Sequence, residues 1–461
     1  MAKAKARRAD PTTLQWRVVS LIVFAVAFGS VLVTLDDPGL AWDEPFSIGA
    51  GQAYAAWLTR LHHLPFDAET IRAHWRLNHE HPPLAKVAMG LTQRLFAGEG
   101  LSIVAARLAI ALTFGLLVEL VFWLGRRLFS GLVGLLAAAC LLCMPRVFGH
   151  AHLASLDLAM ATTWLLSAAA FAVAIDKGRW PWGVASGVCL GLALLTKINA
   201  VFLPVALVAW GVGFHRRRAL APLAWTLGIG VVVFFVGWPW LWLSPIGHLR
   251  GYLFPTGRVA LAVHYFGRLY AHNDVPWHFP LVMTLATIPI GILFLVFLGG
   301  ARAVRRFRVS PELALLAIHA AVAIGPFLTP WLPRYDGVRL FLAAFPFLAL
   351  LAGVGGARCW TWVTQRWPGR PWRPLFITAA FFLSQAAATG WVHPCELSYH
   401  NALVGGLWGA RRIGLEPTYW HDVVNERLFA WLNQHCGVDD AIAFFPVSEA
   451  GVLTVPHPPG S

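Results

Sequence analysis

The sequence predicts an all-α polytopic membrane protein with about eleven transmembrane helices. The 461-residue chain is 58% hydrophobic, only 13% of its residues are charged, and its mean hydropathy is +0.62. Apolar runs of about 18 or more residues recur along it, which is the length a transmembrane helix needs. Only helices and closed barrels satisfy their backbone hydrogen bonds in lipid, and barrel strands do not contain such long apolar runs.

The predicted organisation has three parts. A basic cytoplasmic tail (1–15) precedes a transmembrane domain (16–392), and a short C-terminal region (393–461) follows it. The first span begins in the apolar run that follows the tail, and we expect it to remain uncleaved. The expected spans lie near residues 14–35, 101–125, 130–148, 154–175, 181–196, 197–214, 219–243, 278–299, 311–330, 337–356 and 374–392.

The distribution of basic residues predicts the orientation. With a cytoplasmic N-terminus, the tail with Arg17 and every inside loop are basic, and together they hold 20 of the 36 lysines and arginines. This is the positive-inside pattern. The net charge of +14 is therefore explained by topology, and we expect no nucleic-acid partner, because no basic face with a reading module is present.

The same topology places three long segments outside: the first loop (36–100), a further loop (244–277) and the C-terminal region. The first loop holds eight of the 22 acidic residues, so we expect the chemistry there. Two amphipathic stretches in it, ending near Arg60 and Leu77, suit interfacial helices, with Trp57 and Trp75 as membrane anchors.

The C-terminal region contains a segment (422–436) that is typical of an amphipathic helix and another (441–447) that is typical of a strand. A region this short can barely build a core of its own, so packing against the membrane domain is one expectation. Cys395 and Cys436 both lie outside, where a disulfide is allowed, and the sequence leaves open whether they pair.

The motif NHEHPPLAK (78–86) gathers ionisable groups at the end of the first loop. Its Pro-Pro step favours a helix start, and Lys86 lies about one turn into that helix. A lysine there opposes the helix dipole, which is acceptable if an anion binds nearby, since helix N-termini and lysines both attract phosphate. The spacing alone is equally compatible with a Lys86 side chain that binds no anion and extends towards water.

Further ionisable residues are predicted to converge on the same outer face. Asp157 enters an apolar run, and Lys197 lies in a short outer turn. Arg334, Tyr335 and Arg339 lie at the outer end of another span. Basic groups suit a phosphate, whereas carboxylates suit a general base or a metal site. A divalent cation therefore remains possible, with candidate ligands Asp43, Glu80, His81 and Asp157, although the histidine spacing fits no specific zinc motif.

Several motifs together resemble the family 39 membrane glycosyltransferases, which have the GT-C fold and include the protein O-mannosyltransferases and the lipid A aminoarabinose transferases. They are WDE after the first span, HPPLAK at the end of the first loop, an Asp at the start of the fourth span and LLTK before the sixth. The resemblance covers roughly residues 40–435. It implies an enzyme of the bacterial inner (cytoplasmic) membrane, with an extracytoplasmic active site.

The resemblance also implies an activity and residue roles. A sugar moves, with inversion, from a polyprenyl-phosphate donor in the lipid bilayer to a hydroxyl acceptor on a protein, lipid or glycan. Asp43 is implied as the general base, assisted by Glu44, and the donor phosphate is bound by the basic residues Lys86, Lys197, Arg339 and Arg334. The acceptor or sugar is held by Glu80, His81, Asp157 and Tyr335.

Two readings outside this enzyme class remain open. A transporter or flippase for a lipid-linked sugar would place its ionisable groups near the bilayer midplane, often within inverted repeats. A non-catalytic scaffold with the same fold would tolerate Asp43→Asn without loss of function. The sequence leaves the sugar, the acceptor and the oligomeric state undetermined.

Overall fold

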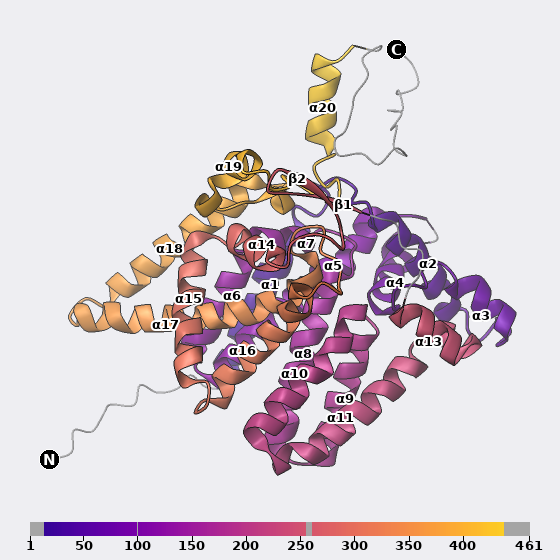
Figure 1. Ribbon diagram of the computed structural model, residues 1–461, viewed down its shortest axis with the longest axis horizontal. Coiled ribbons are helices and arrows are strands. Elements are labelled where there is room, and N and C mark those ends of the chain that lie inside the picture. The colour runs from indigo at the N-terminus through magenta and orange to yellow at the C-terminus, as the bar shows by residue number, and fades with distance from the viewer. Residues whose placement is uncertain (1–12, 99, 255–260, 438–461) are drawn as a thin grey trace.

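The computed structural model describes residues 13–98, 100–254 and 261–437, and it is almost entirely helical (Figure 1). The α-helices are α1 (Thr13–Leu32), α2 (Glu44–Thr59), α3 (Ala68–Trp75), α4 (Leu84–Ala97), α5 (Ile103–Leu128), α6 (Gly131–Leu142), α7 (Pro145–His150), α8 (Asp157–Lys177), α9 (Trp180–Leu194), α10 (Leu203–Trp210), α11 (Arg217–Val236), α12 (Pro239–Leu243), α13 (Pro245–Leu253), α14 (Phe279–Thr287), α15 (Ile290–Arg306), α16 (Pro311–Ile324), α17 (Phe345–Arg366), α18 (Trp372–Val392), α19 (Gly406–Arg412) and α20 (Glu426–His435). Shorter turns of other helix types are η1 (Ile198–Phe202), η2 (Gly211–His215), η3 (Gly325–Leu328), η4 (Arg339–Ala344), η5 (Glu396–Ser398) and η6 (Ala402–Val404). The strands β1 (Ala262–Tyr265) and β2 (Arg268–Ala271) form an antiparallel hairpin.

The all-α membrane architecture is confirmed, and the structure refines the spans. Within the described residues, eight helices are long and apolar enough to cross a membrane, and α6 and α9 are shorter apolar helices. Predicted spans are interrupted at several places, including two breaks next to prolines. The span near 130–148 breaks before Pro145 into α6 and α7, and the span near 278–299 breaks before Ile290, next to Pro289, into α14 and α15. Proline lacks the N–H that would continue the preceding helix, which explains both positions.

The apolar helices pack as one continuous core. Helix α5 lies between α1 and α6, and α17 packs against α6 and α15. Helix α8 contacts both α5 and α9, and α9 pairs along its length with α11. In Figure 1 the helices of the first loop, α2, α3 and α4, lie together with α13 at one side of this bundle.

Close packing of α2 on α4 fixes the first loop. A Cβ at Gly51 would lie 2.3 Å from the carbonyl oxygen of Lys86, and a Cβ at Gly90 would lie 1.9 Å from the carbonyl oxygen of Gly51. Only glycine allows such an approach. The predicted anchoring role of Trp57 and Trp75 is wrong, because both side chains are buried and Trp75 stacks on Tyr54 at 4.4 Å.

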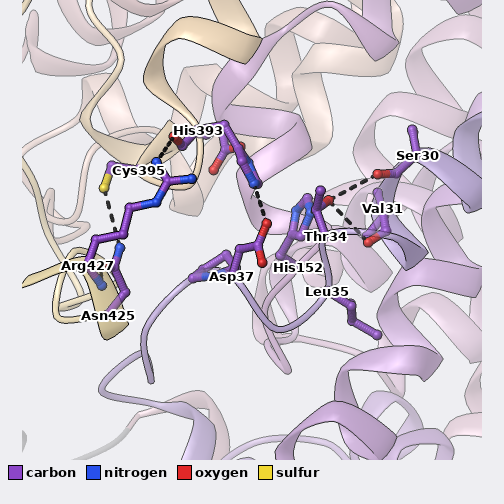
Figure 2. Close-up of polar contacts among 12 residues, drawn as sticks. Ser30, Val31, Thr34, Leu35, Asp37, His152, His393, Cys395, Asn425 and Arg427 are labelled. Atoms are coloured by element: carbon purple, nitrogen blue, oxygen red, sulfur yellow. Dashed lines mark hydrogen bonds and ion pairs between the residues drawn. The ribbon is translucent and has the colours of Figure 1, made fainter. Parts of the chain in front are cut away.

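The segment after α18 returns to the first loop and docks on it. Figure 2 shows His393 beside Asp37, and its Nε2 lies 2.8 Å from the Asp37 Oδ2. The Nδ1 of the same ring lies 2.5 Å from the Oε1 of buried Glu396. Nearby, the Nε2 of His152 lies 2.8 Å from the Thr34 hydroxyl. The expected packing of this region against the membrane domain is therefore present from His393 to about Asn425, before α20.

The predicted amphipathic helix near 422–436 is found as α20, which stands apart from the bundle in Figure 1. The strand predicted at 441–447 lies outside the described residues. All six cysteines are within the described residues, and none forms a disulfide there, so Cys395 and Cys436 are free thiols.

Candidate functional site

An open pocket with about 650 Å³ of empty space lies where the first loop meets the starts of two helices. Its polar lining comes from segments that are far apart in the sequence. The lining residues are Asp43, Phe46, Ser47, Asn78, Glu80, His81, Ser155, Leu156, Asp157, Lys197 and Arg339. Six of the predicted site residues therefore meet in one pocket.

Arg339 is the most highly connected charged group of the pocket. It begins η4, and its Nη2 donates to the Asp43 Oδ2 at 2.7 Å while its Nη1 donates to the Asp336 Oδ2 at 2.6 Å. The Nε lies 3.6 Å from the Asp157 Oδ2. The guanidinium carbon lies over the Trp420 ring, 4.0 Å from the ring centroid. One cation thus connects the first loop, α8, the segment before η4 and the C-terminal segment.

Asp157 and Lys197 form a second, buried ion pair. Asp157 is the first residue of α8, and Lys197 ends the turn between α9 and η1. Removing two charges from water costs free energy, which their mutual attraction and further hydrogen bonds must offset. Here Arg339 provides the additional positive charge beside Asp157.

Asp43 is one of the accessible carboxylates of the pocket. It is the N-cap residue of α2, its side chain caps no backbone N–H, and 38% of the side chain is exposed. Asp157, in contrast, is almost fully buried. The N-terminal ends of α2 and α8 both line the pocket, so two helix dipoles place partial positive charge there.

Glu44 lies outside the pocket lining and serves the fold. It is fully buried, and its carboxylate accepts from Arg107 at both oxygens, at 2.8 and 2.7 Å. It also accepts from the backbone N–H groups of Ala41 and Ala154. The carboxylate therefore ties the start of α2 to α5 and to the segment before α8. This arrangement does not fit the predicted catalytic role of Glu44.

Lys86 also differs from its predicted phosphate-binding role. It is fully buried, and its ammonium donates to the backbone oxygens of Asn78 and His81 at 2.5 and 2.7 Å and to the Asn78 Oδ1 at 3.0 Å. All three donors are therefore used within the motif. Asn78 has a φ of 47°, so the lysine holds a strained turn that lines the pocket. Burial lowers the pKa of Lys86 to about 7, and Glu80 partly opposes this shift.

Arg334 lies outside the pocket lining as well. It is buried, and its guanidinium donates to the backbone oxygens of Thr329 and Asn273, so it ties two loops together. The Tyr335 ring makes a cation–π contact with Arg339, with 5.7 Å between the ring centroid and the guanidinium carbon, but Tyr335 does not line the pocket. Neither residue therefore lines the pocket, although Tyr335 contacts the pocket residue Arg339.

Glu80 and His81 line the pocket as predicted. The sequence reasoning did not select Asn78, Ser47 and Ser155 from the lining, nor the Arg339 partners Asp336 and Trp420. Asn78 lies in the NHEHPPLAK motif, and Asp336 lies in the stretch RYDGVR (334–339), which holds Arg334, Tyr335 and Arg339; their turn-forming residue types were a usable signal. No local pattern marks Trp420.

The candidate metal ligands do not form a metal site. Within the part of the chain that the structure describes, no group of three or more His, Cys, Asp or Glu side chains is arranged to hold a metal ion. Asp43 and Asp157 are instead paired with cationic side chains.

The comparisons with known proteins agree with this architecture. Residues 80–242 match the family described as dolichyl-phosphate-mannose-protein mannosyltransferase. This region contains HPPLAK, Asp157 and Lys197. The match spans about a third of the chain. No curated protein matches the sequence significantly.

Two solved structures of ArnT from Cupriavidus metallidurans share the fold. One is in the apo state and the other is bound to undecaprenyl phosphate. Each superposes with a TM-score of 0.56 at 20% sequence identity and covers 84% of this chain. The alignments cover 70% and 71% of the ArnT chains, respectively. The chain is therefore a membrane protein with the GT-C glycosyltransferase fold.

Proposed function

We propose that the chain is an inverting glycosyltransferase that moves a sugar from a polyprenyl phosphate to a hydroxyl acceptor. The observation that carries the proposal is the pocket in which half-exposed Asp43 contacts Arg339, with Lys197 nearby. A carboxylate, two cations and two helix N-termini supply what the reaction needs. The match to a mannosyltransferase family and the fold shared with ArnT, one structure of which holds undecaprenyl phosphate, support the donor class.

The proposed reaction is a single displacement. The acceptor oxygen attacks the anomeric carbon while its proton passes to the Asp43 carboxylate. The bond from that carbon to the phosphate oxygen breaks, and its electron pair leaves with the polyprenyl phosphate. Lys197, Arg339 and the helix N-termini stabilise the charge that develops there. Attack from the opposite side inverts the anomeric carbon and requires no enzyme nucleophile.

The Asp43–Arg339 contact suggests how the donor prepares the base. A phosphate arriving in the pocket competes with Asp43 for the Nη2 of Arg339, since both are anionic acceptors of the same donor. Loss of this contact would free the Asp43 Oδ2 for the acceptor hydroxyl. The pocket would then hold an active base only when the donor is bound.

The test uses purified protein in detergent with a panel of polyprenyl-phosphate sugars and measures release of free lipid phosphate. We expect turnover of one donor, and a loss of about 100-fold or more in Asp43→Asn, because general bases contribute about that much. Turnover that persists in Asp43→Asn would refute the base assignment. Donor binding without turnover, with every acceptor class supplied, would instead favour a transporter or scaffold.

A further inference from the structure

Trp420 makes an aromatic contact with the candidate site. Its side chain is 6% exposed, and its ring lies 4.0 Å from the Arg339 guanidinium. Asp43 and Asp336 occupy the edge of that guanidinium through Nη2 and Nη1. The carboxylates of Asp43, Asp336 and Asp157 contact nitrogens at the edge of the guanidinium, whereas the Trp420 ring adds a cation–π contact at the guanidinium carbon.

The backbone around Trp420 is held in an uncommon conformation. Trp420 and His421 have φ values of 70° and 62°, a region that L-residues rarely occupy and that costs free energy. Such a conformation persists only where its surroundings hold it. The Thr418 hydroxyl donates to the Asp422 Oδ1 at 3.1 Å and closes the turn.

The same turn holds the residues that lead into Asp43. The Trp42 N–H donates to the Trp420 carbonyl oxygen at 3.0 Å, and the Gly39 N–H donates to the Asp422 carbonyl oxygen at 2.9 Å. A Cβ at Gly39 would lie 2.1 Å from the Val424 carbonyl oxygen, so the two chains approach as closely as glycine permits. The turn therefore reaches both members of the Asp43–Arg339 pair.

We propose that Trp420 is a positioning residue for glycosyl transfer, which orients Arg339 through its ring and the Asp43 loop through its backbone. The inference rests on the proposed function. It means that the segment after the last predicted span completes the site, although it lies far from the pocket-lining motifs in sequence. Because Trp420 itself does not line the pocket, its loss should lower kcat more than it raises the KM for the donor.

The test compares Trp420→Leu and Trp420→Phe with wild type, using the donor that wild type turns over. We expect Trp420→Leu to lower kcat about tenfold with the donor KM changed less than about threefold, and Trp420→Phe to restore most of the loss, since a phenyl ring also binds a guanidinium. Trp408→Leu is the matched control. Trp408 lies in α19 of the same segment, is 75% exposed and should give wild-type kinetics.

A double-mutant cycle tests whether Trp420 acts through Arg339. Arg339→Lys keeps the charge but removes the planar face, so Trp420→Leu should cost less than about threefold in that background. If Trp420→Leu does not fold, Trp420→Phe is compared in the wild-type and Arg339→Lys backgrounds instead. The inference then requires that Trp420→Phe lowers kcat less in the Arg339→Lys background than in wild type. A wild-type kcat in Trp420→Leu, or an equal loss of kcat in both backgrounds, would overturn the inference about Trp420 but leave the proposed function standing. Absence of wild-type turnover with every donor would overturn the proposed function and this inference with it.

Discussion

At the scale of single residues, neighbouring carboxylates in the WDE motif have different surroundings. Asp43 faces the pocket, whereas Glu44 is buried against Arg107 and accepts four hydrogen bonds. Glu44→Gln leaves a buried guanidinium without its counter-charge, and we expect a loss of about 3–5 kcal/mol in the free energy of unfolding. The check is the thermal-unfolding midpoint in detergent, with Glu69→Gln, an exposed carboxylate of the same loop, as control.

The opposite pattern is expected for Asp43→Asn, which should keep the wild-type midpoint and lose turnover. A Glu44→Gln protein with wild-type stability and no turnover would instead support a catalytic role for Glu44.

The residues proposed to bind the donor phosphate can be distinguished by a similar comparison of variants. Lys197 and Arg339 line the pocket, whereas all three donors of Lys86 are used by Asn78 and His81. We therefore expect Lys197→Gln to weaken binding of undecaprenyl phosphate about tenfold or more, since a charge-assisted hydrogen bond contributes about 1.5–3 kcal/mol. Lys86→Met should change the Kd less than about threefold while lowering stability. Binding is measured by titration in detergent, and the reverse order of effects would contradict this assignment.

These residues also show which features of the site could be predicted from the sequence. Apolar runs and basic loops predict the helices, and clustered charges predict which face carries the pocket, because both properties are local. Partner choice is not local: Arg339 and Asp43 are 296 positions apart, and Glu44 pairs with an arginine inside a predicted span. For the same reason a buried lysine that stabilises a turn and a lysine that binds phosphate look alike in the motif. The resemblance to a known family implied the type of site, and the observed contacts of Glu44, Lys86 and Arg334 do not fit the roles that it implied for them.

At the scale of elements, the segment after α18 is attached to the first loop through a histidine between two carboxylates. The hydrogen bond that His393 donates to Glu396, with a further one donated to Asp37, raises the pKa of His393 above its ordinary value of 6.5. Other groups near His393 are His152, whose ring centroid lies 5.9 Å from that of His393, and Arg427, which donates to the His393 carbonyl oxygen. A raised pKa means that the folded state binds the proton more tightly than the unfolded state.

The contribution of His393 to stability is therefore complete below about pH 6.5 and is lost as the pH rises through the raised pKa. We expect the thermal-unfolding midpoint to fall over this window in wild type and to fall less in His393→Gln. Hydrogen exchange of residues 393–437 should rise over the same window. An equal pH dependence in the variant would show that other groups are responsible.

At the scale of the whole molecule, the pocket, the first loop and the C-terminal segment form one unit at one end of the bundle. Arg339 and Trp420 connect them, and the Gly39 contact joins their backbones. If the predicted orientation holds, this entire unit lies on the extracytoplasmic side and the basic turns lie on the other. A polyprenyl-phosphate donor and its acceptor would then meet outside the cell's cytoplasmic compartment.

Single cysteines test this orientation directly. In a variant in which the six native cysteines are replaced, Trp408→Cys lies in the segment that docks on the pocket, and Arg305→Cys lies at the end of α15. In sealed vesicles whose cytoplasmic face is inside, a membrane-impermeant maleimide should label Trp408→Cys and label Arg305→Cys only after permeabilisation. The positive-inside distribution of 20 basic residues is the physical reason for this expectation. Inverted labelling would place the pocket on the cytoplasmic face and would require a cytoplasmic acceptor.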